Sequence, residues 1–168
     1  MKRVLLTGMS GTGKSTVIEE LAARGYRAID ADYHGLTELA RVPDDDPTSV
    51  APGHDWLWRE DRIQDLLSAD DVDLLFLSGC APNQGRFYPQ FDHIILLTAP
   101  VIAARLTTRT NNPYGKLPHE LARVLHLQRT IEPLIRPAAD LEIDTSAPID
   151  QVVAKILRQV RERPAVPE

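Results

Sequence analysis

The stretch Gly8-Met9-Ser10-Gly11-Thr12-Gly13-Lys14-Ser15 decides how this chain folds, because it matches the phosphate-binding pattern G-x-x-x-x-G-K-[ST] at every fixed position. The short apolar run Val4-Leu5-Leu6 precedes it, and residues 15–24 follow with a helical spacing of apolar side chains. A strand, a glycine-rich turn and a helix are the context that this motif requires. The stretch therefore predicts a Walker A phosphate loop rather than a glycine-rich turn that binds nothing.

The residue types in this stretch suit a hydrated, highly charged triphosphate. Glycine at positions 8, 11 and 13 lets the backbone approach the phosphates closely, and the following helix presents unpaired N–H groups to them. Lys14 would place a positive charge on the terminal phosphates, and the Ser15 hydroxyl would ligate Mg²⁺. We expect ATP and Mg²⁺ as ligands, although no motif here separates ATP from GTP. The residues expected to bind the nucleotide phosphates are Gly8, Ser10, Gly11, Thr12, Gly13, Lys14, Ser15 and Thr16.

Length and composition favour one domain over residues 1–168 with a core of ordinary size. A net charge of −5 without a basic tract argues against nucleic acid as the main partner. The single cysteine, Cys80, excludes an intrachain disulfide. No apolar run is long enough for a signal peptide or a membrane span. We therefore expect a cytoplasmic protein, a monomer or small homo-oligomer, with no nucleic-acid or membrane partner.

Short apolar runs alternate with helical patterns along the chain, which is typical of a parallel α/β domain. Strands are expected at 3–7, 26–30, 73–78, 93–98 and 141–145. Helices are expected at 15–24, 55–68, after Pro100, at 118–130 and from 149 onward. Prolines and glycine predict that residues 33–54 are irregular. The three adjacent aspartates at 44–46 are interpreted as a solvated loop rather than a metal site.

Two carboxylates close the second expected strand, where ligands bind in open α/β sheets. Asp32 is expected to touch the acceptor substrate as a base or hydrogen-bond acceptor, and Asp30 to position a water on Mg²⁺. The alternative is a helix cap or a turn, which aspartate also favours. No aspartate ends the third strand at the Walker B position, so Ser78 and the Gly79 backbone are the candidates for ligand contacts there.

Three arginines are candidates for contacts with the substrates. Arg59 follows Trp56 and Trp58 in the expected helix 55–68, where it would bind an anionic or hydroxylated acceptor or form surface salt bridges. Arg105 and Arg109 are four residues apart and share a helix face. Next to a turn-rich segment, they would belong to a lid that neutralises charge on the transferred group. The alternative is a solvated helix face.

With these residues the chain resembles the small P-loop kinases of the nucleoside-monophosphate-kinase type, and shikimate kinase most of all. The resemblance implies a three-layer α/β/α P-loop NTPase fold with a five-stranded parallel sheet of order 2-3-1-4-5 and a small lid. It implies that the lid lies at about 105–118 and the acceptor-binding region at about 31–70. The pair Asp30-x-Asp32 resembles the family's D-x-D, whose second aspartate binds the acceptor hydroxyl.

The same resemblance assigns further contacts. Arg59 falls near the family's substrate arginine, and Gly79 begins the segment that follows the third strand. The loop Asp144-Thr145-Ser146-Ala147-Pro148 resembles the adenine-contacting loop, in which Pro148 and a lid arginine, here Arg109, sandwich the base. Two departures argue against shikimate as the acceptor. Gly79-Cys80-Ala81 replaces a glycine triplet, and Ile131 stands where the family has its carboxylate-binding arginine.

The residues and the resemblance together predict an ATP-dependent kinase that phosphorylates a hydroxyl of a small molecule. Lys14, Asp32, Arg105 and Arg109 are the expected catalytic residues. Two alternatives stay open at this point. The protein would instead be a nucleotide-dependent regulatory ATPase, or an ATP sensor without an acceptor.

Overall fold

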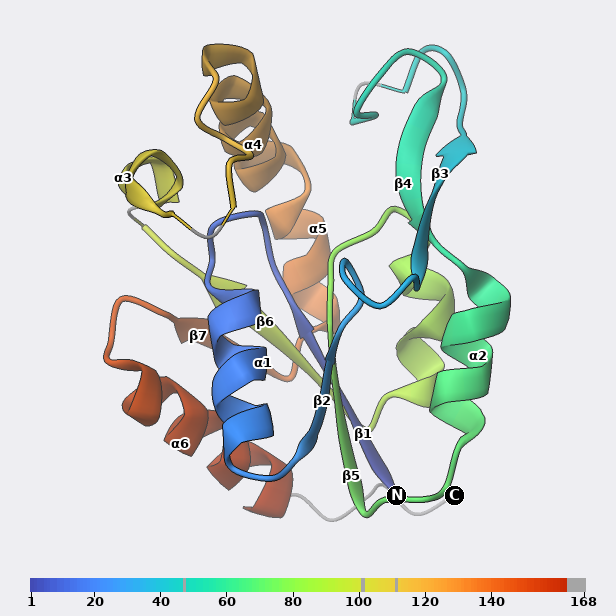
Figure 1. Cartoon of the computed structure of the whole chain (residues 1–168), viewed down its shortest axis with the longest axis vertical. Coiled ribbons are helices and arrows are strands. Elements are labelled where there is room, and N and C mark those ends of the chain that lie inside the picture. Colours follow the sequence, from blue (N-terminus) through green and yellow to red (C-terminus); the bar gives the residue numbers. More distant parts are fainter. Residues whose placement is uncertain (47, 101, 111, 163–168) are drawn as a thin grey trace.

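A central parallel sheet lies between two layers of helices in the computed structural model, which describes residues 1–46, 48–100, 102–110 and 112–162 (Figure 1). The strands follow the order β2-β5-β1-β6-β7, and each neighbouring pair is parallel. Without the separate hairpin β3–β4, this is the predicted order 2-3-1-4-5, so the three-layer P-loop fold is confirmed. The strand bounds are β1 Lys2–Thr7, β2 Arg27–Asp30, β5 Leu74–Ser78, β6 His93–Thr98 and β7 Leu141–Asp144.

The uniformly apolar strands result from helices that cover both faces of the sheet. On β1, Val4 and Leu6 pack toward α1 (Lys14–Ala23) and α6 (Ile149–Glu162), whereas Leu5 packs toward α2 (Glu60–Ser68) and the short 3₁₀ helix η1 (Gln84–Gln90). The period-3.6 pattern predicted for the last helix is confirmed. Its buried residues are Val152, Val153, Ile156 and Val160.

The side of the molecule that contains the predicted lid, called the lid side below, is built from α3 (Ile102–Thr108), α4 (Pro118–Thr130), α5 (Glu132–Ile135) and the 3₁₀ turn η2 (Arg136–Ala138). A third core cluster joins α3, α4 and α5 to Met9 of the phosphate loop. At the start of α4, the Glu120 carboxylate accepts hydrogen bonds from the backbone N–H of Gly115 (2.8 Å) and Leu117 (3.4 Å). These bonds satisfy donors that the helix leaves unpaired and fix how the lid segment enters α4.

The region between β2 and α2 differs from the sequence prediction. Residues expected to be irregular contain β3 (Thr37–Arg41), and the first residues of the expected helix form β4 (His54–Trp58), which pairs with β3 in antiparallel register. Aromatic residues favour strands, and pairing with a partner distant in sequence overrides helical periodicity. The helix α2 starts only at Glu60, where Glu60 and Asp61 in its first turn complement the helix dipole.

This correction exchanges the roles of the two tryptophans. In a helix over 55–68, Trp56 would share the apolar face with Ile63, Leu66 and Leu67, and Trp58 would lie partly off it; in the structure, Trp58 is 1% exposed and Trp56 is 53% exposed. The indole of Trp58 packs against Phe87 and lies over Gly79, where an added Cβ would come within 3.0 Å of it. Asn83 holds the strand in place, because its side chain bonds both the N–H and the C=O of Trp58 at 2.9 Å.

Two further expectations concern the surface. Asp44 and Asp45 are exposed, and the described residues contain no group of three His, Cys, Asp or Glu side chains that could hold a metal ion. The interpretation of residues 44–46 as a solvated loop is therefore consistent with the structure. Within the described ranges, every helix is too short or too polar to cross a membrane.

The two tryptophans provide a test of this arrangement. Replacing Trp58 by alanine would leave a cavity against Phe87 and Gly79 and lower the free energy of unfolding by about 3–5 kcal/mol. The exposed Trp56 is the matched control. Trp56→Ala should change the free energy of unfolding by no more than about 0.5 kcal/mol. Urea unfolding of both variants measures the difference. Equal losses would contradict the strand assignment of residues 54–58.

Candidate functional site

The phosphate loop turns sharply between β1 and α1 because glycine occupies its three positions of positive φ, 8, 11 and 13. Gly8 has φ +148°, and a Cβ there would lie 2.3 Å from the carbonyl oxygen of Leu97. Gly13 has φ +89° and is the N-cap of α1. The Thr12 hydroxyl closes the loop by donating to the Met9 carbonyl at 2.8 Å. The loop therefore wraps around the N-terminus of α1, where free N–H groups and the helix dipole favour an anion.

Lys14 and Ser15 lie at the mouth of this loop. The Lys14 ammonium donates to the backbone carbonyls of Gly8 (2.7 Å) and Met9 (3.0 Å), so its charge is held inside the loop. The Ser15 hydroxyl donates to Oδ2 of Asp30 at 2.7 Å, and Oδ1 of Asp30 accepts the N–H of Asp32 at 3.1 Å. The loop and the carboxylate pair predicted from the end of the second strand thus form one constellation.

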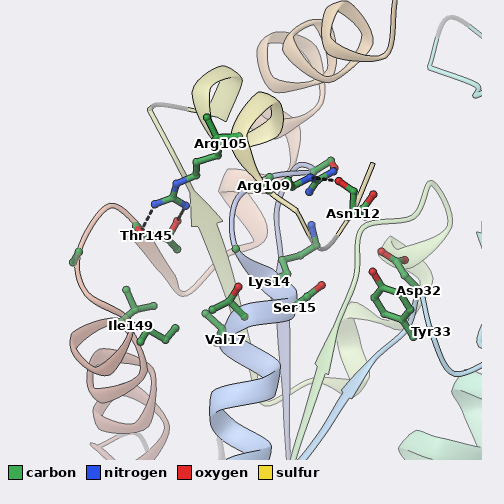
Figure 2. A pocket seen from close by; sticks show the side chains of 17 residues that line it. Lys14, Ser15, Val17, Asp32, Tyr33, Arg105, Arg109, Asn112, Thr145 and Ile149 are labelled. Atoms are coloured by element: carbon green, nitrogen blue, oxygen red, sulfur yellow. Dashed lines mark hydrogen bonds between the residues drawn. The ribbon is translucent and has the colours of Figure 1, made fainter. Parts of the chain in front are cut away.

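A pocket of roughly 360 Å³ opens in front of the loop, at the carboxyl edge of the sheet (Figure 2). Ligands of open α/β sheets bind at this edge. The predicted site residues that line it are Ser10, Gly11, Gly13, Lys14, Ser15, Thr16, Asp32, Arg105 and Arg109. Gly8 and Thr12 shape the loop from within and are not in the lining.

Both lid arginines reach the pocket, but they face different parts of it (Figure 2). Arg105 donates to the hydroxyl of Thr145 at 2.7 Å and to its carbonyl, and Thr145 donates in turn to the Thr12 carbonyl at 2.7 Å. Arg109 lies over the phosphate loop, where its Nη2 is 3.5 Å from the Ser10 hydroxyl. Arg105 therefore orders the loop after β7, whereas Arg109 faces the phosphate side.

The Asp32 carboxylate is the acidic group of the pocket lining. Asp32 as a residue is exposed, but its carboxylate is partly desolvated in the pocket, which raises its pKa above the ordinary value; Lys14 opposes this increase and Asp30 adds to it. Burial also lowers the pKa of the Arg109 guanidinium, against the influence of Tyr33 and Tyr114. A carboxylate with a raised pKa, next to fixed positive charges, has the properties of a general base.

Besides Gly8 and Thr12, four predicted residues are not part of the pocket lining. Asp30 meets the pocket through Ser15. Arg59 lies 3.9 Å from Glu38 and 3.8 Å from Asp61, which matches the alternative of surface salt bridges. The Trp58 indole covers Gly79. Pro148 lies between two lining residues, Ala147 and Ile149, without lining the pocket itself.

Sequence reasoning missed several lining residues. Tyr33 is 63% exposed beside Asp32, and its place directly after the aspartate pair was a usable signal. Thr145 directly follows β7 and belongs to the loop that the resemblance assigned to adenine, although no individual contact was predicted for it. Asn112 lines the pocket and its carbonyl accepts from Arg109 at 3.1 Å; the predicted lid at about 105–118 included it, but its own contacts were not predicted.

A comparison with models of protein families identifies the family of this chain. Residues 4–126 match the family model described as AAA domain. The chain belongs to the AAA domain family. A curated relative from Acidiphilium cryptum (strain JF-5), described as a nucleotide-binding protein, is 29% identical over 148 residues. That alignment covers 86% of this chain but 44% of the relative, so this AAA domain spans less than half the length of that protein.

Solved structures share the fold of this AAA domain. Shikimate kinase from Acinetobacter baumannii, in complex with shikimate, is 21% identical with a TM-score of 0.65, over 96% of this chain and 94% of that one. A sugar kinase from Janibacter sp. HTCC2649 is also 21% identical, with a TM-score of 0.59 over 100% and 99% of the two chains. The predicted likeness to shikimate kinase-like P-loop kinases is therefore confirmed, and the fold is that of a nucleotide-binding, kinase-like protein.

A substitution at Gly8 tests the geometry of the phosphate loop. Gly8→Ala would drive a methyl group into the Leu97 carbonyl, destabilising the loop by about 2 kcal/mol or more and removing Mg-ATP binding. Gly85→Ala is the control, because a Cβ there meets nothing within 4 Å. Thermal unfolding with and without Mg-ATP measures both effects. A nucleotide-induced shift that persists in Gly8→Ala would show that the phosphates bind elsewhere.

Proposed function

We propose that this protein is a kinase that transfers the γ-phosphoryl group of ATP to a hydroxyl of a small-molecule acceptor. The observation that carries the proposal is the shared pocket of Lys14 and Asp32, in which a phosphate-binding cation and a carboxylate with a raised pKa face the same space. A nucleotide-binding module without chemistry needs the cation but not the carboxylate. Transfer to a hydroxyl needs both.

On the nucleotide side, the loop N–H groups and Lys14 would hold the phosphates. The base would lie toward the loop after β7, where Ala147 and Ile149 line the pocket and Pro148 lies between them. Arg105 supports this loop through its two hydrogen bonds to Thr145. Arg109, near Ser10, would stabilise charge on the group in transfer. Catalysis would then rest on positioning and electrostatics, as expected for phosphoryl transfer.

The residues next to Lys14 fit a magnesium ion. Mg²⁺ takes oxygen ligands, keeps several waters, and uses one or two protein groups together with substrate phosphates. The Ser15 hydroxyl would ligate the ion and Asp30, 2.7 Å from that hydroxyl, would hold one of its waters. When bound, Mg²⁺ would neutralise negative charge on the phosphates. The burial of Asp30, at 5% exposure, keeps its carboxylate fixed toward Ser15.

On the acceptor side, Asp32 would orient the hydroxyl and remove its proton as the bond to phosphorus forms. The neighbouring Tyr33 would contact the body of the acceptor from the rim of the pocket. Arg59 and Gly79 would contribute to acceptor binding only indirectly. Arg59 forms salt bridges with Glu38 and Asp61, and the Trp58 indole covers Gly79. The acceptor therefore enters next to the end of β2.

An assay of ADP release tests the proposal against its alternatives. Purified protein with Mg-ATP would be screened with and without sugars, polyols, nucleosides and carboxylic acids. ADP that depends on an acceptor supports a kinase. ADP formed equally without acceptors would indicate a regulatory ATPase, and no ADP despite ATP binding would indicate a sensor. Either of these two results contradicts the proposal.

Two substitutions separate the roles of the pocket residues. Lys14→Ala should abolish transfer and weaken Mg-ATP binding, because the phosphates lose their point charge. Asp32→Asn should lower kcat by about 10²–10⁴-fold, the usual contribution of a general base, while the Kd for Mg-ATP stays nearly unchanged. Steady-state kinetics and calorimetric titration provide the numbers. If Asp32→Asn weakened ATP binding as much as turnover, an acceptor-side role would be wrong.

The pH profile provides a separate prediction. Asp32 acts as a base only when ionised, so activity is present above its pKa and is lost as the pH falls through it. Because partial desolvation raises this pKa, the acid limb of log kcat/KM should lie above the ordinary aspartate value of 3.8. The residual activity of Asp32→Asn should lack that limb. A limb that persists unchanged in Asp32→Asn would assign it to another group.

A further inference from the structure

Arg123 of α4 connects two segments that are far apart in the sequence, the loop and strand at 48–55 and the segment 112–116. Its Nη2 donates to the Thr48 carbonyl at 2.6 Å, its Nε to the Ser49 carbonyl at 3.4 Å, and its Nη1 to the Tyr114 hydroxyl at 3.0 Å. Its Nη2 also lies 3.7 Å from Oδ1 of Asp55. One guanidinium thus contacts both the β3–β4 unit and the segment 112–116, and α4, which carries it, lies opposite the β3–β4 unit in Figure 1.

This contact is more than a surface ion pair. The side chain of Asp55 is 7% exposed and that of Arg123 is 28% exposed, so water screens the pair only in part. The guanidinium is a planar fork with five N–H donors, which lets it bond several acceptors in fixed directions at once. Lysine has the same charge but lacks that fork.

The acceptors on the hairpin side are also held in place by hydrogen bonds that do not involve Arg123. Oδ1 of Asp46 accepts the Thr48 N–H at 2.8 Å and the Thr48 hydroxyl at 2.7 Å. These bonds, with a smaller contribution from Arg123, hold the pKa of Asp46 below its ordinary value. The Asp55 carboxylate is fixed by the N–H of Trp56 at 2.8 Å. The loop therefore presents its carbonyls to α4 in a defined geometry.

On the lid side, Tyr114 carries the connection to the pocket. Its hydroxyl accepts from Arg123, while its backbone carbonyl accepts from Nη2 of Arg109. Asn112 orders the same segment, because its Oδ1 accepts the N–H of Tyr114 at 2.9 Å. Arg109 in turn reaches the Ser10 hydroxyl of the phosphate loop. A continuous series of contacts runs from the hairpin through Arg123, Tyr114 and Arg109 to the phosphate side.

We propose that Arg123 is a positioning residue that holds the lid segment 112–116 and the β3–β4 unit at one separation and thereby keeps Arg109 aimed into the pocket. Arg123 does not line the pocket, so its effect on transfer would pass through Tyr114 and Arg109. The kinetic consequence rests on the proposed kinase function, whereas the coupling of the two segments does not. Arg123 therefore acts on the alignment of the charge-stabilising lid and not on ATP affinity.

The test uses the full chain with small changes that preserve folding. Tyr114→Phe removes one oxygen and leaves the carbonyl that Arg109 contacts. Arg123→Lys keeps the charge beside Asp55 but loses the fork. The double variant completes a cycle, since residues that act through one contact are not additive. Arg129→Ala is the matched control on the same helix, because Arg129 is exposed and its Nε donates to Leu125 within α4.

Kinetics with the acceptor identified by the ADP screen should show that the variants lower kcat without a matching change in the Kd for Mg-ATP. Tyr114→Phe and Arg123→Lys should each lower kcat by about tenfold, the size of a lost charge-assisted hydrogen bond, with the Kd for Mg-ATP within about threefold of wild type. The kcat of the double variant should be no more than about twofold below that of the less active single variant. Arg129→Ala should have the kcat of wild type. The proposal would be overturned if the decrease in kcat of the double variant equalled the product of the two single decreases. It would also be overturned if the single variants changed only the Kd for Mg-ATP.

Hydrogen exchange provides a second measurement that does not depend on turnover. In both single variants, backbone amides of 48–55 and of 112–116 should exchange faster together, with the sheet amides unchanged. Unchanged exchange in either segment would overturn the coupling. If wild type forms no acceptor-dependent ADP, the kinase function fails, and this exchange result alone decides whether Arg123 couples the two segments.

Discussion

The close approach of the phosphate loop to strand β6 is the constraint on which the site depends. At Gly8 the backbone passes so near the Leu97 carbonyl that no side chain fits, and Met9 next to it is buried in the cluster formed with α3, α4 and α5. The loop is thus wedged between the sheet and the lid side. Because the loop is packed on both sides, the N-terminus of α1 is fixed toward the pocket. The loop is therefore preorganised for an anion before any ligand binds.

Hydrogen bonds connect the phosphate loop and the start of α1 to the ends of two strands, β2 and β7. Toward the end of β2, the Ser15 hydroxyl is bonded to Asp30, which accepts the backbone N–H of Asp32, so one carboxylate joins the proposed magnesium ligand to the proposed acceptor residue. Toward β7, Thr145 is bonded to Thr12 and Arg105. Hydrogen bonds to neighbouring groups thus fix Ser15 and Thr145 in place, an arrangement that would suit the preorganised site of the proposed kinase.

The features that sequence could predict are those that depend on local pattern or on the rule of the sheet edge. Strand β6 is a continuous apolar run and α4 starts at a proline, so both were located at their observed bounds. The hairpin was missed because β4 exists only through its pairing with β3 and through Asn83, which holds Trp58 from 25 residues away. The contacts of Arg123 likewise join segments whose proximity no local pattern encodes.

A crystal structure with Mg²⁺ and a non-hydrolysable ATP analogue tests the central claim most directly. The account predicts the triphosphate inside the loop 8–15, with the Lys14 ammonium transferred from the carbonyls of Gly8 and Met9 to phosphate oxygens. It also predicts the metal beside Ser15 and the γ-phosphate facing Asp32. A triphosphate bound outside the loop, or a γ-phosphate turned away from Asp32 with Lys14 still on the carbonyls, would contradict it.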